Sequence, residues 1–370
     1  MQTVDAAGLS IGDGHPPRIM GVLNLSPDSP YAPSVFDDPV EAAAYVDGMI
    51  AEGADVVDVG LESANKRFAV QDADWELSRL DLAFETLRRV EAEAVFSIET
   101  RYAAVADAAL SGGFDLVNDI AGFADPAMPD VCEAHDAAVV KMAGDGDLTR
   151  PGALESVDDI YDALADRLTE KTIVDPAFGG WSEAKTLADD RETFHRLREF
   201  RALGQPILVS INRKNFLREL AGRATDDALP VSLAATSMAV ERGAHVVRTH
   251  DVAATRDAAL VGHAFARDRV RGERVEELDV TTRREAGRHV DRLGVEADAT
   301  AGVARAFALS DLDDGDGLPE VARDAGACAA VDGDRGFLAG SAAALSRVVD
   351  ALADTDLADV ADGVDEALSR

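Results

Sequence analysis

The feature that most constrains this chain is a regular alternation of short apolar runs with longer amphipathic segments. The short runs, such as VVDVG at 56–60 and ILVSI at 207–211, are rich in β-branched residues and lack polar–apolar alternation. Such runs are typical of parallel strands covered on both faces. Eight strands are therefore expected, at 18–25, 55–62, 95–100, 116–122, 137–143, 172–178, 206–213 and 246–252.

Eight strand-and-helix units in about 250 residues predict an α/β protein built as a (β/α)8 TIM barrel. The intervening segments, for example 39–51, 103–112 and 157–171, have the composition and spacing of helices. A doubly wound open sheet is the competing architecture. No GxGxxG follows the first predicted strand, which removes the main sequence reason to prefer that fold.

The repeat stops near residue 268, so three regions are expected. Residues 1–17 form an N-terminal lead, 18–268 the barrel, and 269–370 a C-terminal extension of unknown role. Helical patterns at 283–293, 341–353 and 357–368 predict that this extension is a small α or α/β module. A partly disordered acidic extension is the alternative.

The charge of the chain excludes several classes of function. Its 370 residues include 70 Asp and Glu against 36 Lys and Arg, a formal net charge of −34. Such a surface repels phosphate backbones and anionic lipids, so nucleic-acid and membrane binding are not expected. The acidic residues are dispersed, as in proteins of salt-loving archaea. The sequence shows no signal peptide and no apolar run of about 18 residues, and we expect a cytoplasmic protein.

Polar side chains end nearly every predicted strand, where barrel enzymes carry their catalytic residues. Each buried polar group left without a partner costs about 1–3 kcal/mol, so a full set at one end of the barrel indicates a functional site. These residues are Asn24, Asp58, Glu62, Glu99, Asn118, Asp119, Lys141, Asp175, Arg213, Lys214, Arg248, His250 and Asp251.

The ends of the seventh and eighth strands predict a cationic cluster of Lys214, Arg248 and His250. In a strongly acidic protein, local cations are what a phosphate or pyrophosphate substrate requires. Asn24, on the neighbouring first strand, is a neutral oxygen ligand suited to Mg²⁺ that phosphate oxygens already hold.

A second group of strand ends supplies hydrogen-bond acceptors and an amide. Glu99, Asn118 and Asp175 together match the donor–acceptor edge of a flat, guanidine-like heterocycle. The sequence therefore predicts a site for a small molecule that combines a polar ring with an anionic group.

Seven motifs resemble those of the dihydropteroate synthase family, in order, over residues 18–268. They are IMGVLNLSPDS, EGADVVDVGLES, SIET, LVNDIAGFADPAM, VDPAFG, INRKNF and VRTHDV. The resemblance implies a transferase that condenses 4-aminobenzoate with the pyrophosphate ester of 6-hydroxymethyl-7,8-dihydropterin, releasing pyrophosphate. It also implies a homodimer and Mg²⁺ as cofactor.

The resemblance assigns roles to particular residues. Catalytic roles fall to Lys214, Asp175 and Glu99, and the metal ligand is Asn24. The pterin is held by Asn118, Asp175 and Lys214, with Met142 lining the ring pocket, while Arg248 and His250 bind the pyrophosphate.

The chain departs from the family pattern mainly in its loops. The third-strand Asp of the family is Glu99 here, and the second loop lacks the usual Thr and phosphate-binding Arg. Ser63 and Arg67 are the substrate-binding candidates that remain in this loop, with Arg67 expected to replace the lost cation and Lys66 as the alternative. After Asp175 the usual glycine-rich run becomes AFGGWSEAK.

Three other functions stay open on this sequence. The altered loops are compatible with another arylamine as second substrate or with a pterin-binding protein that has lost catalysis. A related methyltransferase that hands a methyl group from a reduced pterin to a corrinoid is the third. No role is expected for His195, which lies in a helical context without metal-site spacing.

Overall fold

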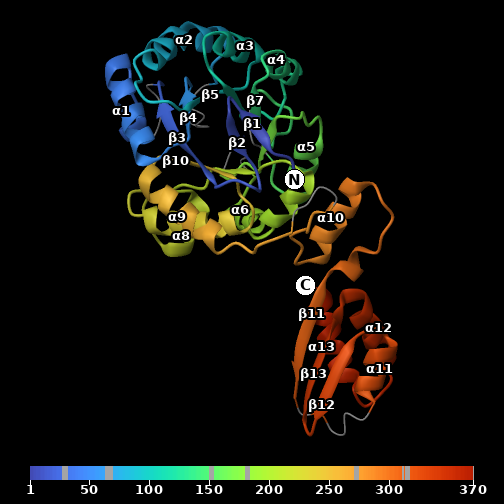
Figure 1. The fold of residues 1–370 in the computed structure, drawn as a ribbon. Helices are drawn as coiled ribbons and strands as arrows, with labels where there is room; N and C mark the ends of the chain where they lie inside the picture. The colour runs from blue at the N-terminus through green and yellow to red at the C-terminus, as the bar shows by residue number, and fades with distance from the viewer. Residues whose placement is uncertain are drawn as a thin grey trace. The chain divides into compact units, whose positions relative to one another are not determined.

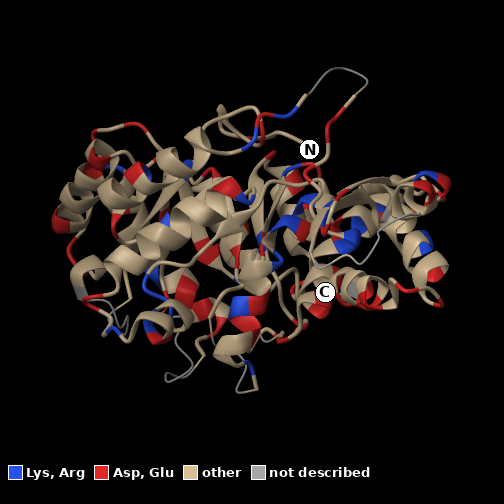
Figure 2. Ribbon diagram, turned by 90° about the horizontal axis from the view of Figure 1, so that it is seen from below, with Lys and Arg blue, Asp and Glu red and all other residues tan. Residues whose placement is uncertain are grey.

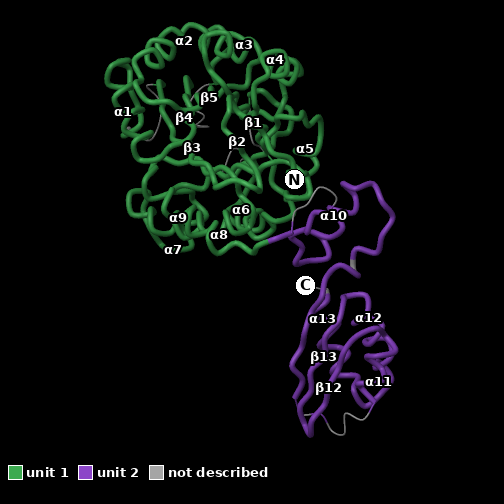
Figure 3. Tube along the Cα trace, viewed as in Figure 1, with its two compact units in different colours: residues 1–268 green, residues 269–370 purple. Residues whose placement is uncertain are grey.

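The computed structural model describes residues 1–26, 32–62, 70–149, 154–179, 184–270, 275–310, 312 and 317–369. The chain divides into two compact units, Met1–Asp268 and Arg269–Arg370 (Figure 3).

The first unit is a (β/α)8 barrel, which confirms the predicted fold class (Figure 1). Its parallel strands follow the order β8-β7-β6-β5-β4-β3-β10-β9. A bridge between Val174 and Ile207 joins the two ends of this order and closes the barrel. The strands are β3 (Arg18–Asn24), β4 (Val56–Gly60), β5 (Val95–Thr100), β6 (Leu116–Asp119), β7 (Ala138–Met142), β8 (Thr172–Asp175), β9 (Leu208–Val209) and β10 (Val246–Thr249).

Helices surround the strands and cover their outward faces (Figure 1). Outward residues such as Val57, Val117 and Val139 pack in one apolar cluster with Val46 and Ala106 of these helices. The helices are α1 (Pro39–Glu52), α2 (Ala73–Leu87), α3 (Ala103–Ser111), α4 (Met128–Ala134), α5 (Val157–Ala165), α6 (Leu187–His195), α7 (Asn215–Ala221), α8 (Leu229–Glu241) and α9 (Val252–Ala264), with 3-10 turns at Ala32–Ser34 and Leu197–Leu203.

A second, separate apolar cluster fills the N-terminal end of the barrel. It gathers the first inward residues of the strands, such as Val56, Leu116 and Val246. Residues 1–17, expected as a lead, form a hairpin of β1 (Val4–Ala6) and β2 (Leu9–Ile11) whose apolar side chains belong to this cluster. The hairpin therefore closes the end of the barrel opposite the strand C-termini.

A buried ion pair fastens this hairpin to the barrel. Arg201 donates to both carboxylate oxygens of Asp13 at 2.8 and 2.9 Å, and His245 lies 3.2 Å from one of them. Burial alone raises the pKa of Asp13, but the hydrogen bond from His245 and the charge of Arg201 hold it well below its usual range. This end of the molecule therefore serves stability.

The second unit pairs a small antiparallel sheet with helices. Its strands β11 (Ala304–Leu309), β12 (Cys328–Asp332) and β13 (Arg335–Ser341) have the order β11-β13-β12. Leu338 of the sheet packs with Leu318 and Leu345 of the helices. The expected extension is therefore of the α/β kind. Its helices are α10 (Arg283–Leu293), α11 (Leu318–Asp324), α12 (Ala342–Leu352) and α13 (Ala358–Ser369), and a 3-10 turn spans Ala299–Gly302.

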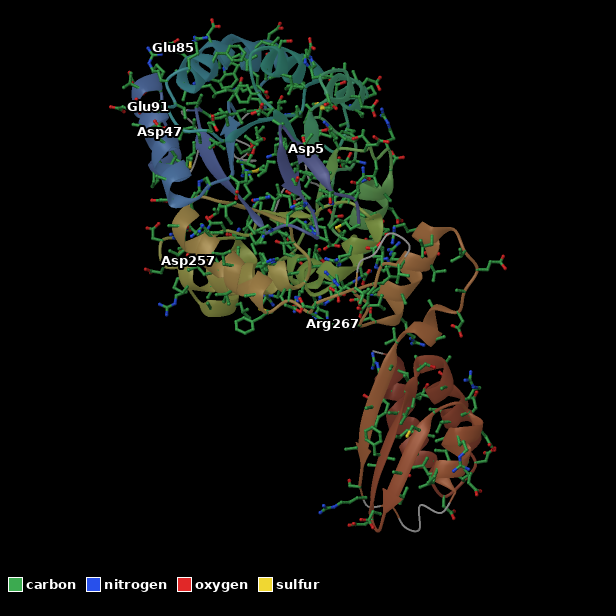
Figure 4. All side chains as sticks on the ribbon, viewed as in Figure 1. Asp5, Asp47, Glu85, Glu91, Asp257 and Arg267 are labelled. Carbon is green, nitrogen blue, oxygen red and sulfur yellow. The ribbon has the colours of Figure 1, made fainter. Side chains whose placement is uncertain are left out.

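The acidic residues are spread along the whole ribbon rather than gathered in one block (Figure 2). Glu85 on α2 and Asp257 on α9 are examples that lie at the outer edge of the barrel (Figure 4). In the part of the chain that the structure describes, no helix has the length and apolar character needed to cross a membrane.

Candidate functional site

Alternation along the barrel strands places the polar residues of the site. On β4 the side chain of Val56 points inward, so Asp58, two residues later, points inward as well. Strand register sets Asp58 beside Ser97 and Glu99 beside Asn118. The inside of the barrel therefore changes from an apolar layer near the strand starts to a polar layer near the strand ends.

Asp58 is the centre of this polar layer. One carboxylate oxygen accepts from the Ser97 hydroxyl at 2.7 Å. The other accepts from Asn118 Nδ2 at 2.9 Å and from Arg248 Nε at 2.7 Å. Asp58 is fully buried, and these three donors come from β5, β6 and β10. The contacts therefore join four strands through one carboxylate.

Arg248 is shared between two carboxylates. Besides Asp58, its guanidinium donates to Glu99 Oε2. Burial opposes the charge of Arg248, but Glu99 and Asp58 hold its pKa above the usual range. Burial raises the pKa of Glu99, against the attraction of Arg248. This cation is therefore paired with two carboxylates of the chain itself.

Asp175 and Lys214 form a second charged pair at the same end of the barrel. Burial raises the pKa of Asp175 to about 6, although the backbone N–H of Ala177 donates to it at 2.8 Å and Lys214 attracts it. Burial and the charge of Arg248 lower the pKa of Lys214, while Asp175 opposes that shift. The two groups stabilise each other's charge in a poorly solvated place.

His250 carries no charge at neutral pH in this environment. Burial lowers its pKa to about 3, and the nearby charge of Arg248 acts in the same direction. The cationic cluster expected from the sequence is therefore different in the structure. Lys214 and Arg248 supply its charge, Asp175, Asp58 and Glu99 balance that charge, and His250 adds a neutral ring.

Asn24 has the inward parity of Met20 on β3. Its Nδ2 donates to the Ser34 hydroxyl at 2.7 Å. A Cβ placed on Gly60 would lie 3.4 Å from Asn24 Oδ1 and 3.8 Å from Glu99 Oε1, so both oxygens face the space that the glycine leaves open. Among the described residues, no group of three or more His, Cys, Asp or Glu could hold a metal ion.

Several of the polar strand ends point away from this site. Lys141 donates to the carbonyls of Ala163 and Asp166 at the end of α5. Asp119 accepts the backbone N–H groups of the turn that follows β6. These side chains belong to the outer layer of the barrel, where they satisfy backbone groups. Met142, in contrast, has the inward parity of Ala138 and lies beside Asp175 in the sheet register.

Asp251 pairs with the end of the neighbouring strand. It accepts from Arg213 through both carboxylate oxygens, at 2.8 and 3.0 Å, and from Asn212 at 3.0 Å. It makes no side-chain cap to α9. The pair joins the end of the seventh barrel strand to the end of the eighth and fixes the approach to Lys214.

Ser63 and Arg67, the candidates from the second loop, lie outside the described residues. The described residues on either side of them are well anchored. Glu62 forms a buried ion pair with Arg101 and accepts the backbone N–H of Gln71 at 2.8 Å. Arg101 also donates to the carbonyl of Leu148 at 3.1 Å. The charge of Arg101 is therefore paired with Glu62, the last described residue before the second loop.

Sequence reasoning left Asp58 and Ser97 out of the substrate-binding set. Asp58 was visible as a polar strand end, and its inward parity with Val56 is the signal that places it inside the barrel. Ser97 gives no comparable signal, because a serine within a strand is compatible with many environments. Only the three-dimensional register shows that it donates to Asp58.

The fold and the polar mouth define a barrel enzyme that handles a small polar molecule. The sequence profile of the family described as pterin binding enzyme matches residues 20–250. This chain belongs to that family.

Known proteins similar to this chain fall into three groups. It is 33% identical over 247 residues to a probable bifunctional folylpolyglutamate synthase/dihydropteroate synthase of Haloferax volcanii, covering 63% of this chain and 29% of that protein. It is 34% identical over 264 residues to the inactive dihydropteroate synthase 2 of Mycobacterium tuberculosis, covering 64% and 79%. A structure of Xanthomonas albilineans dihydropteroate synthase with 4-aminobenzoic acid is 29% identical, with a TM-score of 0.60 and coverage of 71% and 97%.

We predict that Ser97→Ala destabilises the barrel by about 1–3 kcal/mol, because a buried oxygen of Asp58 loses its donor. Ser78→Ala is the control: Ser78 also makes a 2.7 Å hydrogen bond, but near the surface of α2, and its loss should cost no more than about 0.5 kcal/mol. Chemical denaturation in concentrated salt measures both. Equal small effects would contradict the role given to Asp58.

Proposed function

We propose that this chain is a dihydropteroate synthase, which joins 6-hydroxymethyl-7,8-dihydropterin pyrophosphate to 4-aminobenzoate in folate biosynthesis. The observation that carries this proposal is the inward polar layer of a pterin-binding barrel, in which an amide, three carboxylates and two cations meet at the strand ends. Support also comes from the similarity to a dihydropteroate synthase that was solved with 4-aminobenzoic acid.

The pterin ring is assigned to Asn118, Asp175 and Lys214. Asp175 accepts from the guanidine-like edge of the ring, and Lys214 donates to a ring acceptor. Met142 lies beside Asp175 in the register and supplies an apolar contact for the ring.

Charge exchange at Arg248 is the central step that we assign to the protein. When pyrophosphate arrives, Arg248 keeps Asp58 and moves its second contact from Glu99 to the phosphate oxygens. The bond between the pterin methylene and the pyrophosphate oxygen then breaks, with Arg248 and His250 binding the departing anion. Glu99, freed from its partner, stabilises the cationic methylene. The amine of 4-aminobenzoate attacks that carbon to form the new C–N bond, and its proton goes to the departing pyrophosphate.

Mg²⁺ is proposed as the cofactor, with Asn24 as its protein ligand. The donor set fits a weakly held ion, because Ser34 fixes Asn24 Nδ2 while Asn24 Oδ1 faces the space above Gly60. A metal that phosphate oxygens hold requires few protein ligands. When bound, it would neutralise charge on the leaving pyrophosphate.

A second candidate function is pterin binding without catalysis. It is favoured by the similarity to mycobacterial proteins named inactive dihydropteroate synthase 2 and by the altered second loop. A related candidate function has the same chemistry with another arylamine. It is favoured because the second loop differs from the family pattern, whereas the residues assigned to the pterin ring match it.

A product assay distinguishes these candidates. The protein is incubated with the pterin pyrophosphate, 4-aminobenzoate and Mg²⁺ in concentrated KCl, and pyrophosphate release and the mass of 7,8-dihydropteroate are followed together. We expect both signals. Binding of the pterin pyrophosphate without coupling would instead favour the non-catalytic protein or another arylamine, and absence of binding would contradict the proposal.

We predict that Lys214→Ala and Arg248→Ala each lower turnover by roughly a hundredfold or more, because each removes a cation that faces the substrate. His195→Ala is the matched control, since it lies at the end of α6 and has no assigned role, and it should leave turnover nearly unchanged. Steady-state kinetics on the three purified variants measure these effects. Similar mild losses in all three would refute the site assignment.

The pH dependence should report Asp175. Its pKa is raised to about 6, so the carboxylate that accepts from the pterin is lost as the pH falls through that value. We predict that kcat/KM falls about tenfold per pH unit below 6. Asp175→Asn should have low activity, and its kcat/KM should no longer fall as the pH drops below 6. If kcat/KM of Asp175→Asn still falls below pH 6, the titrating group lies elsewhere, for example on the substrate pyrophosphate.

Three further properties are part of the proposal. The net charge of −34 supports a protein adapted to concentrated salt, which screens the self-repulsion of its surface. We propose a cytoplasmic location, consistent with a small-molecule biosynthetic role. The family resemblance supports a homodimer, which light scattering in concentrated KCl can test.

A further inference from the structure

Two buried charged residues beside the site are unused by the mechanism above. Lys185 and Asp190 have side chains that are only 1% and 3% exposed, and their charged atoms lie 3.4 Å apart. Asp190 is in α6, and Lys185 lies just before that helix. Burying an ion pair costs desolvation energy, so its retention next to a substrate site calls for a role beyond stability.

The pair contacts the backbone of the turn that follows β8. Lys185 Nζ donates to the carbonyl of Ala177 at 2.7 Å. Asp190 Oδ1 accepts the backbone N–H of Gly179 at 3.1 Å. Asp175 itself accepts the N–H of Ala177 at 2.8 Å. Three buried side-chain contacts therefore fix a turn of five residues.

This turn adopts a conformation that needs support. Ala177 has φ +60° and Gly179 has φ +111°, and the first of these is unfavourable for a residue with a side chain. The carbonyl and the N–H that Lys185 and Asp190 bind belong to these two residues. The ion pair therefore stabilises the strained part of the turn.

The turn at 175–179 also fixes the surroundings of Lys214. A Cβ on Gly179 would lie 2.9 Å from Lys214 Nζ and 3.4 Å from its Cδ, so the backbone at Gly179 is in close contact with that side chain. The charges of Asp190 and Lys185 also act on Lys214, the first supporting its protonated form and the second opposing it. Movement of the turn would displace both Asp175 and Lys214.

We propose that Lys185 and Asp190 are positioning residues, which hold the turn at 175–179 in the shape that receives the pterin substrate. The identity of that substrate rests on the proposed function. The pair touches no reacting atom, and its effect is transmitted through the turn to Asp175 and Lys214. It therefore acts on binding of the pterin substrate more than on the chemical step or on 4-aminobenzoate.

The first test compares Lys185→Met with Lys171→Met in the full-length protein. Lys171 is a matched control, because its Nζ also donates to a backbone carbonyl at 2.7 Å and pairs with a carboxylate, that of Asp136, near the start of β8. Lys185→Met should raise the KM for the pterin pyrophosphate roughly tenfold or more, with kcat and the KM for 4-aminobenzoate changed by less than about threefold. Lys185→Arg keeps the positive charge, so its KM for the pterin pyrophosphate should be much closer to that of the wild-type protein.

The second test needs no substrate. Hydrogen–deuterium exchange followed by mass spectrometry should show faster exchange in peptides containing 175–179 for Lys185→Met and for the isosteric Asp190→Asn, and no change for Lys171→Met. Asp190→Asn keeps the test available if Lys185→Met does not fold. Unchanged exchange, or faster exchange with an unchanged KM for the pterin pyrophosphate, would overturn the proposal.

The two tests separate this inference from the proposed function. If the wild-type protein neither binds nor converts the pterin pyrophosphate, the proposed function fails, and the substrate assignment made here fails with it. Exchange at 175–179 would still show whether the ion pair holds the turn. If the wild-type protein is active and the Lys185 and Asp190 variants match it, the proposed function stands and the positioning role is wrong.

Discussion

The carboxylate of Asp58 receives hydrogen bonds from three other strands, and the arrangement of the whole site depends on it. Ser97 and Asn118 fix its orientation, and Arg248 is held against it at 2.7 Å. A buried carboxylate with this many donors is satisfied, whereas one deprived of them would destabilise the barrel. The contacts that satisfy Asp58 also position the guanidinium of Arg248 at the mouth of the barrel. Stability and ligand recognition therefore share one group.

The charge of Arg248 explains how a strongly acidic protein can prepare a site for an anion. Asp58 and Glu99 both pair with this guanidinium, so carboxylates of the barrel itself compensate its buried charge. In the proposed function, an incoming pyrophosphate replaces Glu99 as partner of Arg248 and leaves that carboxylate near the carbon where positive charge develops. Glu99 is one methylene longer than the aspartate of the family pattern, which helps it reach Arg248 across the barrel.

Much of the barrel was predictable, because its signals are local and repeated. The unbroken apolar runs gave the strands, and the strand ends pointed to Asn118, Asp175, Lys214 and Arg248 as a group. Their mutual contacts were not predictable, since a partner such as Asp58 for Arg248 lies 190 residues away in the chain. The protonation state of His250 could not be predicted from the sequence either. Its pKa falls to about 3 because of burial and the charge of Arg248, and its neighbours in the sequence reveal neither cause. The hairpin at residues 1–17 escaped prediction because its strands have only three residues each.

The most direct test of this account is a crystal structure with 6-hydroxymethyl-7,8-dihydropterin pyrophosphate, determined in concentrated salt. The account predicts the ring between Asn118, Asp175 and Lys214. It also predicts pyrophosphate oxygens on Arg248, which keeps Asp58 and releases Glu99. A ligand bound away from these residues, or bound while Arg248 still contacts both carboxylates, would contradict it.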